Sequence, residues 1–201
     1  MEYVYKTYCI SRMLLDKGSG YVLNNELREF KKTQRVYGDN KGIVGSIYDL
    51  TYDASLITDN IYLGNAYNAR DYYKLKDQNI GLIINCTKDI PNYFEEYGEI
   101  EYERVDVQDV NGADILPYIK KVVPIIEKYI EKNPKKNILV HCFMGSSRSA
   151  SIVIGYLMKK LSLRRRDALN LAKQKRDLVN INTDFFEQLR KYEKFLKLKG
   201  C

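Results

Sequence analysis

The sequence predicts an α/β fold with a central, mostly parallel sheet of about four to five strands flanked by helices. Short apolar runs, GLIIN at residues 81–85 and NILVH at residues 137–141, are typical of strands buried on both faces. Between and after these runs, apolar residues recur at the three- and four-residue spacing of helices. Alternating strands and helices favour a parallel sheet, because parallel neighbours need a crossover connection.

Strands are expected at residues 60–63, 81–85, 102–107 and 137–141. The first is a short candidate, and the second and fourth are the apolar runs. The third alternates Val105 and Val107 with polar neighbours. A helix-like segment at residues 66–78 connects the first two strands.

Further helices are expected from Asp114 to about residue 132, and at residues 150–158, 163–175 and 183–197. In the first of these, Pro117 suits an opening turn, whereas Pro124 predicts a kink or a break in the interior. The run at residues 150–158 is too apolar to be amphipathic, which predicts a central, buried helix.

Residues 1–55 read differently and are expected to form an N-terminal extension, with residues 56–201 as the main domain. Glycines divide the extension into short segments, and one helix is expected in it, at residues 24–32. We interpret the extension as a docking or dimerisation element. A docking motif for a kinase is one hypothesis, carried by Lys31, Lys32, Arg35 and Val36, and a homodimer is another.

The composition is that of a soluble globular protein, with 45% apolar and 29% charged residues. No apolar run approaches the ~20 residues of a membrane span, and the first residues lack the apolar core of a signal peptide. An intracellular location, cytoplasmic or nuclear, is therefore expected. The four cysteines form no CxxC pair and the chain has one histidine, so neither a metal nor a cofactor is expected.

The net charge of +7 favours anionic partners, such as phosphoproteins, acidic lipids or nucleic acid. A solvated, lysine-rich surface is the simpler alternative. Arg164, Arg165 and Arg166 stand at an expected helix start, where cations oppose the helix dipole. Either an acidic partner or a solvated face explains them.

The stretch ILVHCFMGSSRSAS carries the chemistry. It reads as a strand, a turn from Cys142 to Arg148, and a helix whose N-terminus favours an anion. Gly145 permits the backbone angles of such a turn, and the guanidinium of Arg148 matches two phosphate oxygens. Thiols at helix N-termini beside cations ionise readily, which makes Cys142 a candidate nucleophile. The hydroxyl of Ser149 could hydrogen-bond this thiolate, and His141 is expected to orient the loop.

At these residues, HCFMGSSRS resembles the His-Cys-x-x-Gly-x-x-Arg-Ser signature of the cysteine-dependent protein tyrosine phosphatases, and SRSAS resembles their dual-specificity branch. ITDNIYLGN (57–65), IINCT (83–87) and NTDFFEQL (182–189) resemble further motifs of that branch, in family order. The resemblance covers residues 56 to 196 or so. It implies a metal-independent phosphatase domain acting through a phosphocysteine intermediate.

The resemblance also implies the roles of individual residues. Cys142 attacks phosphorus, Arg148 holds the phosphoryl group, and Ser149 assists breakdown of the intermediate. The remaining loop residues bind substrate: Phe143, Met144, Gly145, Ser146 and Ser147. His141 and Asn85 give structural support. Arg176 matches a position that can reach a second phosphate, although Ile181 replaces a proline usual in the family.

A general acid is sought in ERVDVQDVNGAD. The strand alternation places Asp106 on the face opposite Val105 and Val107. Asp109 lies beyond the strand end, in a loop that could move over the site. Asp114 suits a helix cap. The family pattern also falls on Asp109, which we take as the acid.

The loop has no lysine and no second histidine, unlike related lipid and RNA phosphatases, which favours phosphoprotein substrates and no nucleic acid. A shallow site would admit phosphoserine and phosphothreonine as well as phosphotyrosine. The alternatives are a phosphoinositide or RNA 5′-phosphatase, and a module that binds phosphoproteins without turnover. Cys86 is expected on a neighbouring strand, as a core thiol or as the partner of Cys142 in an oxidative disulfide.

Overall fold

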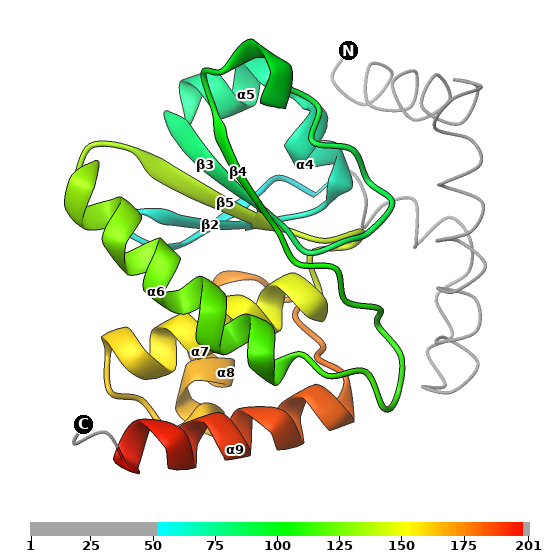
Figure 1. Cartoon of the computed structure of the whole chain (residues 1–201), viewed down its shortest axis with the longest axis vertical. Coiled ribbons are helices and arrows are strands. Elements are labelled where there is room, and N and C mark those ends of the chain that lie inside the picture. Colours follow the sequence, from blue (N-terminus) through cyan, green and yellow to red (C-terminus); the bar gives the residue numbers. More distant parts are fainter. Residues whose placement is uncertain (1–51, 199–201) are drawn as a thin grey trace. The chain divides into compact units, whose positions relative to one another are not determined.

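The computed structural model describes residues 52–198. A five-stranded sheet has the order β1-β2-β5-β3-β4, and only the pairing of β1 with β2 is antiparallel. The strands are β1 (Ser55–Thr58), β2 (Ile61–Gly64), β3 (Ile80–Asn85), β4 (Glu101–Arg104) and β5 (Asn137–His141). The predicted α/β class with a mostly parallel sheet is confirmed (Figure 1).

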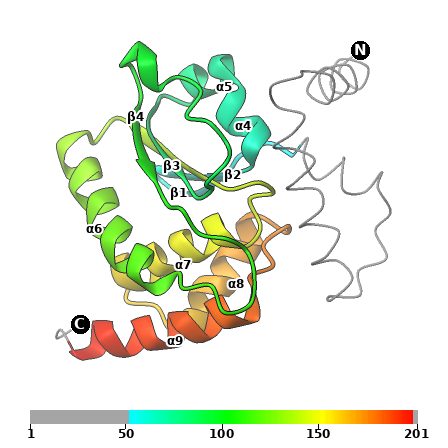
Figure 2. The same ribbon diagram turned by 45° about the vertical axis from the view of Figure 1, so that its right-hand side comes forward.

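Helices cover both faces of this sheet. Two short helices, α4 (Ala66–Arg70) and α5 (Tyr72–Asp77), lie on one face, and the other face carries α6 (Leu116–Lys132), α7 (Arg148–Lys160), α8 (Arg165–Lys175) and α9 (Thr183–Leu198) (Figures 1 and 2). A single-turn 3-10 helix, η1 (Glu95–Tyr97), precedes β4. Within the described part of the chain, every helix is too short or too polar to span a bilayer.

The central strands contribute side chains to two hydrophobic cores, because successive side chains of a strand point to opposite faces of the sheet. Ile138 and Val140 of β5 pack in the large core under α6–α9, whereas Leu139 packs in the smaller core on the side of α4 and α5. In β3, Ile84 and Ile83 divide in the same way. All five side chains are buried, as expected for the inner strands of a sheet covered on both faces.

The helix predicted at residues 66–78 is divided in two. Asn65 begins α4 with a capping box shared with Asn68. Asp71 then leaves the helical conformation, and its side chain accepts a hydrogen bond from the Lys74 N–H at 3.2 Å, which starts α5. Aspartate prefers such a capping position to a helix interior. The polar residue therefore outweighs the apolar spacing that suggested one helix.

Three further expectations differ from the structure. Helix α6 runs unbroken through Pro124, which is exposed while the neighbouring Val123 and Ile126 are buried against the core. Strand β4 ends at Arg104, so the predicted strand at residues 102–107 is too long, although Val105 and Val107 are both buried. Strand β1 was not predicted. The expected helix at residues 24–32 lies outside the described residues.

Helix α7 is the central buried helix that the sequence predicts, and every side chain from Arg148 to Met158 is buried. It lies close to α6: a Cβ atom at Gly155 would stand 2.6 Å from Cγ2 of Ile119. Residues 142–147 connect the end of β5 to the start of α7. They form a tight loop over the N-terminus of this helix.

Candidate active site

The segment from Cys142 to Arg148, the first residue of α7, is here called the cysteine loop, and it wraps around the Cys142 sulfur atom. The Gly145 N–H and the Ser149 hydroxyl each donate a hydrogen bond to Sγ, both at 3.2 Å. The Cys142 side chain is 2% exposed. These two hydrogen bonds hold the sulfur atom at the centre of the loop.

Gly145 meets two requirements that other residues cannot. Its φ is +70°, a conformation that strains residues with a side chain. A Cβ atom there would also lie 2.4 Å from the Gly64 carbonyl oxygen at the end of β2. The cysteine loop is further tied to this edge by the Ala66 N–H, which donates to the Phe143 carbonyl at 3.1 Å.

Arg176 braces the cysteine loop from behind, and its predicted role at a second phosphate stays a prediction. Its Nε donates to the Gly145 carbonyl at 3.0 Å, and its Nη2 donates to the Met144 carbonyl at 3.2 Å. Nη1 donates to the carbonyl of Asp53 at 2.9 Å and to the Ser55 hydroxyl at 3.3 Å. Arg176 is 1% exposed, and its guanidinium is engaged with the loop.

The segment after α8 holds the other side of the loop. The Ser146 hydroxyl donates to the Leu178 carbonyl at 2.7 Å, and the Asn180 N–H donates to the Ser146 carbonyl at 3.0 Å. The Asn182 N–H donates to Oγ of Ser147 at 3.1 Å. The two serine side chains are therefore engaged by the protein, which leaves the backbone N–H groups as the loop's main donors toward an anion.

Phe143 and Met144 differ in exposure. The Phe143 side chain is 3% exposed and is part of the interior, so it supports the loop. Met144 is partly exposed, and its predicted contact with substrate stays a prediction.

Of the three candidate acids, the structure brings Asp109 to the cysteine loop. Its Oδ1 accepts a hydrogen bond from the Ser147 hydroxyl at 2.8 Å, and its Oδ2 lies 3.9 Å from Nε of Arg148. Asp106 is exposed. Asp114 accepts a hydrogen bond from the Leu116 N–H at 3.2 Å at the start of α6, close to the predicted capping role.

Two residues of α9 hold the far end of the segment that carries Asp109, and no role was predicted for either of them from the sequence. Asp184 accepts a hydrogen bond from the Gly112 N–H at 2.7 Å. The Gln188 side chain accepts from the N–H groups of Ile115 and Leu116, and donates to the Ala113 carbonyl at 2.7 Å. The available signal was a pair of polar residues four positions apart beside the apolar stripe of this helix.

His141 and Asn85 are buried neighbours at the ends of β5 and β3. Burial lowers the pKa of His141 from 6.5 to about 4, so the imidazole is neutral near pH 7. Its Nδ1 lies 3.3 Å from the Cys142 carbonyl and, as the only possible donor of the pair, carries the proton. Asn85 donates to the Ile90 carbonyl at 2.8 Å and accepts from Thr87, so it shapes the turn after β3.

Cys86 is a free, fully buried thiol beside the cysteine loop. Its N–H donates to the His141 carbonyl at 2.8 Å. Burial, reinforced by the nearby Cys142, raises the pKa of Cys86 well above its usual value, which favours the core-thiol interpretation. Cys142 is also free. Among residues 52–198, no group of three or more histidine, cysteine or acidic side chains is placed to hold a metal ion.

Comparison with known proteins identifies the family. The family model described as dual specificity phosphatase, catalytic domain, matches residues 61–195. The chain is 36% identical over 174 residues to protein phosphatase Slingshot homolog 1 of Mus musculus, covering 87% of this chain and 16% of that protein. It is 32% identical over 143 residues to dual specificity protein phosphatase 9 of Homo sapiens, covering 71% and 37%. The chain thus matches well under half the length of these relatives.

The solved structures agree. The crystal structure of human DUSP28 is similar with a TM-score of 0.67 and 26% identity, covering 72% of this chain and 98% of that one. The chain belongs to the dual specificity phosphatase catalytic domain family.

Proposed function

We propose that this protein hydrolyses phosphotyrosine and phosphoserine or phosphothreonine in proteins through a phosphocysteine intermediate, without a metal. One observation carries the proposal: a buried cysteine whose sulfur accepts two hydrogen bonds lies in the same loop as Arg148, with Asp109 bonded across it. These groups supply the nucleophile, the anion site and the proton donor that the reaction needs.

In the first step, the Cys142 thiolate forms a bond to phosphorus as the bond to the substrate oxygen breaks. The guanidinium of Arg148 and the N–H groups of the loop bind the phosphoryl oxygens, where negative charge is spread in the transition state. Asp109, protonated, gives its proton to the departing oxygen. The contact with Ser147 supports this role because it directs the carboxyl group toward the loop.

In the second step, a water molecule attacks phosphorus and the bond between sulfur and phosphorus breaks. Asp109, now a carboxylate, takes the proton from the water, and inorganic phosphate leaves. The thiolate is the leaving group, and the hydroxyl of Ser149 and the N–H of Gly145 stabilise it at 3.2 Å each. Ser149 therefore has its largest effect on this step.

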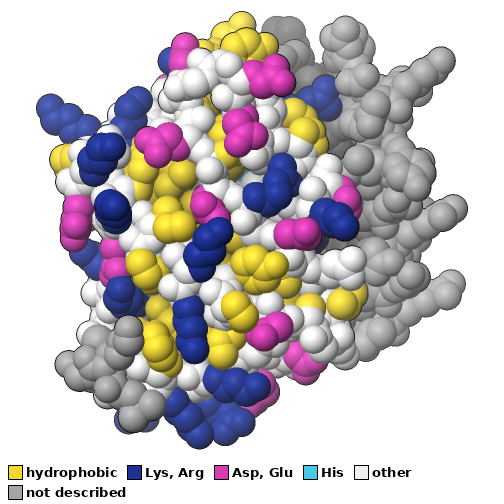
Figure 3. All heavy atoms as spheres, viewed as in Figure 1, with side chains coloured by type: hydrophobic (Ala, Val, Ile, Leu, Met, Phe, Trp, Pro, Cys, Tyr) yellow, Lys and Arg dark blue, Asp and Glu magenta, His cyan; other side chains and the backbone are white. Residues whose placement is uncertain are grey.

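Protein substrates are favoured over highly charged lipids or RNA ends. The cysteine loop contributes one cation, Arg148, and Arg176 is buried behind the loop and engaged with it. A headgroup with several phosphates would need further cations beside the first. On most of the face in Figure 3, lysine and arginine side chains are interspersed with acidic and apolar ones, which fits the solvated-surface alternative for the positive net charge.

The further hypotheses about the whole protein stay predictions. A kinase partner and a homodimer both depend on residues 1–55, which lie almost wholly outside the described part of the chain. An intracellular location is supported by the two free thiols, Cys86 and Cys142, because disulfides form in oxidising compartments.

The test is phosphate release from phosphotyrosyl and phosphothreonyl peptides in a chelating buffer, by the wild type and by Cys142→Ser. Release that the substitution abolishes, together with a radiolabelled protein adduct trapped by rapid acid quenching, is the expected result. Ser149→Ala should raise the amount of trapped adduct, because it slows breakdown more than formation. A folded wild type that releases phosphate from neither peptide would overturn the proposal, and release from phosphoinositides alone would favour the lipid alternative.

A further inference from the structure

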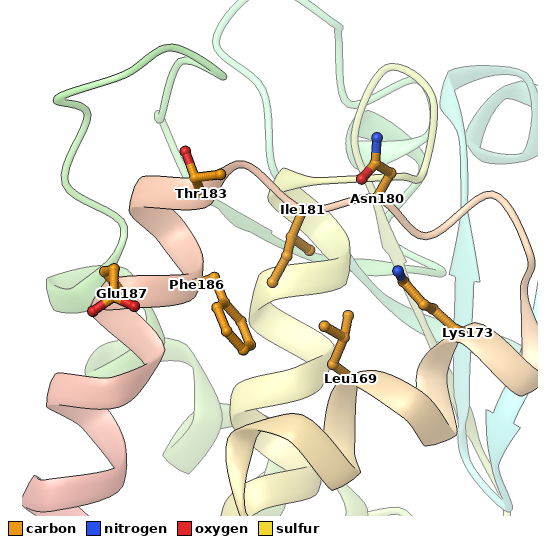
Figure 4. A pocket seen from close by; sticks show the side chains of 7 residues that line it. All are labelled: Leu169, Lys173, Asn180, Ile181, Thr183, Phe186 and Glu187. Carbon is orange, nitrogen blue, oxygen red and sulfur yellow. The ribbon is translucent and has the colours of Figure 1, made fainter. Parts of the chain in front are cut away.

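A groove between α8 and α9 adjoins the cysteine loop and has no part in the chemistry described above. Its volume is about 290 Å³. Leu169 and Lys173 come from α8, Asn180 and Ile181 from the connecting segment, and Phe186 and Glu187 from α9 (Figure 4). We refer to it as the α8–α9 groove.

The floor of the groove is apolar. The side chains of Leu169, Ile181 and Phe186 point toward one another, as Figure 4 shows, and each is only partly buried. The Phe186 ring is held in place by Arg165, whose guanidinium lies 4.4 Å from the ring centroid. An apolar side chain inserted here would remove this exposed surface from water.

The groove is continuous with the phosphate site. Asn180, which lines it, donates its N–H to the Ser146 carbonyl at 3.0 Å. Ile181 is the next residue, and Asn182 after it donates to Oγ of Ser147 at 3.1 Å. One segment therefore forms both the wall of the groove and the support of the cysteine loop, so the groove lies next to the phosphate site.

The charges at the rim are unequal. Glu187 is neutralised by two arginines, at 3.2 Å from Arg165 and 2.8 Å from Arg190, and these contacts lower its pKa. Lys173 is exposed and makes no ion pair with any of residues 52–198. The uncompensated charge at the rim is thus positive.

We propose that the α8–α9 groove is a substrate subsite, which binds a large apolar side chain two or three residues from the phosphorylated residue and prefers an acidic residue beside it. The inference rests on the proposed function, because the phosphorylated residue is what brings the segment to the groove. An extended peptide advances about 3.3 Å per residue, so two or three residues reach a neighbouring subsite. The partner is therefore a phosphoprotein segment with apolar and acidic residues near the phosphate.

The first experiment compares phosphopeptides that differ only in the flanking residues. Leucine is moved through the three positions on each side of the phosphorylated residue in an alanine background. We expect kcat/KM to rise about tenfold at one of these positions, which is the usual effect of filling an apolar pocket. A scan in which all positions give the same kcat/KM overturns the proposal.

The second experiment exchanges the charge at the rim. Lys173→Glu should lower kcat/KM about fivefold for a peptide with aspartate beside the leucine, and raise it for the matching peptide with lysine. Lys175→Glu is the control, because Lys175 lies on the same last turn of α8 and does not line the groove. An inverted preference in Lys173→Glu alone supports the subsite, since a folding defect lowers both rates. Equal effects of the two substitutions overturn it.

A small aryl phosphate separates this inference from the proposed function, because it has no flanking residues. Its hydrolysis by the wild type and by Lys173→Glu should be equal. Normal aryl phosphate turnover without any peptide preference overturns the subsite alone. Turnover of phosphoinositide vesicles but of no peptide overturns both proposals.

Discussion

The two loops that meet at the candidate active site are held in different ways. The cysteine loop is buried, with Cys142 at 2%, Ser147 at 6% and Arg148 at 7% exposure, and it is braced on two sides. The acid loop, residues 105–115, is largely on the surface, and the side chain of Asp109 is 29% exposed.

The difference matches what the two loops must do. A nucleophile and an anion site work best when their donors are already in place, because no energy is then lost in reorganisation. A proton donor must reach the substrate after it has entered, so a loop held by a few surface hydrogen bonds can open and close at little cost. Substitutions in the first loop should therefore damage the fold as well as the rate, and those in the second should damage mainly the rate.

Gly145→Ala should have the largest effect on stability and activity, because it changes the buried cysteine loop. The positive φ and the 2.4 Å approach of the new Cβ atom to the Gly64 carbonyl should together cost about 4 kcal/mol of stability, with loss of nearly all activity. Urea unfolding and peptide turnover measure the two effects.

Gly98→Ala is the matched control for this prediction. Gly98 has a φ of +69°, but a Cβ atom there would meet nothing within 4 Å. Only the conformational strain is then present, and a loss of about 1 kcal/mol with unchanged activity is expected. Equal losses from the two substitutions would show that the contact with β2 contributes nothing.

Asp109→Asn should lower kcat about 10²- to 10³-fold for phosphotyrosyl peptides, with the free energy of unfolding nearly unchanged. The loss should be much smaller for an aryl phosphate with a good leaving group, which needs no proton. Asp106→Asn is the control, because the Asp106 side chain is exposed and the bond from the Tyr118 hydroxyl goes to its backbone carbonyl, which the substitution keeps. A larger loss in Asp106→Asn than in Asp109→Asn would reverse the assignment of the acid.

The parts of the site that could be predicted from the sequence are those formed by neighbours in the chain. The strand, the turn and the helix around Cys142 are local, so residue types and apolar runs were enough to predict them. The choice of Asp109 needed one further inference, that it follows the end of a strand. The structure has Asp109 beside the cysteine loop, although β4 ends earlier than predicted.

The contacts that could not be predicted from the sequence join distant segments. Arg176 bonds to the backbone of Asp53, 123 positions away, and no local pattern shows which way such a long side chain points. Gln188 supports the start of α6 across 72 and 73 positions. Asp71 was missed for another reason, because its own capping bond competes with the apolar spacing around it.

The buried His141, which precedes the cysteine loop, should make the stability of the protein depend on pH. Its pKa is about 4 in the folded protein and 6.5 without burial, so the unfolded chain binds the extra proton between these values. The stability that neutral His141 contributes is complete above about pH 6.5 and is lost as the pH falls toward 4.

Urea unfolding at pH 7 and at pH 4.5 measures this loss, which should be about 2 to 3 kcal/mol larger in the wild type than in His141→Asn. Asparagine keeps a donor for the Cys142 carbonyl, and the carboxyl groups that also titrate are common to both proteins. Because the chain has a single histidine, the difference reports this side chain alone. Identical pH dependence in the two proteins would mean that folding leaves the pKa of His141 unchanged.

Ser147 links the two loops, so its substitution should have the smallest but the most specific effect. The hydroxyl donates to Asp109 at 2.8 Å and accepts from the Asn182 N–H at 3.1 Å, and thereby ties the movable acid to the braced loop. Ser147→Ala should lower kcat about tenfold for phosphotyrosyl peptides, equal to about 1.4 kcal/mol, because Asp109 is less well positioned. The same substitution in the Asp109→Asn background should cost much less, since no acid is left to position. If Ser147→Ala lowered kcat equally in both backgrounds, the role of Ser147 would be to shape the anion site. The contacts with α9 would then be enough to position the acid loop.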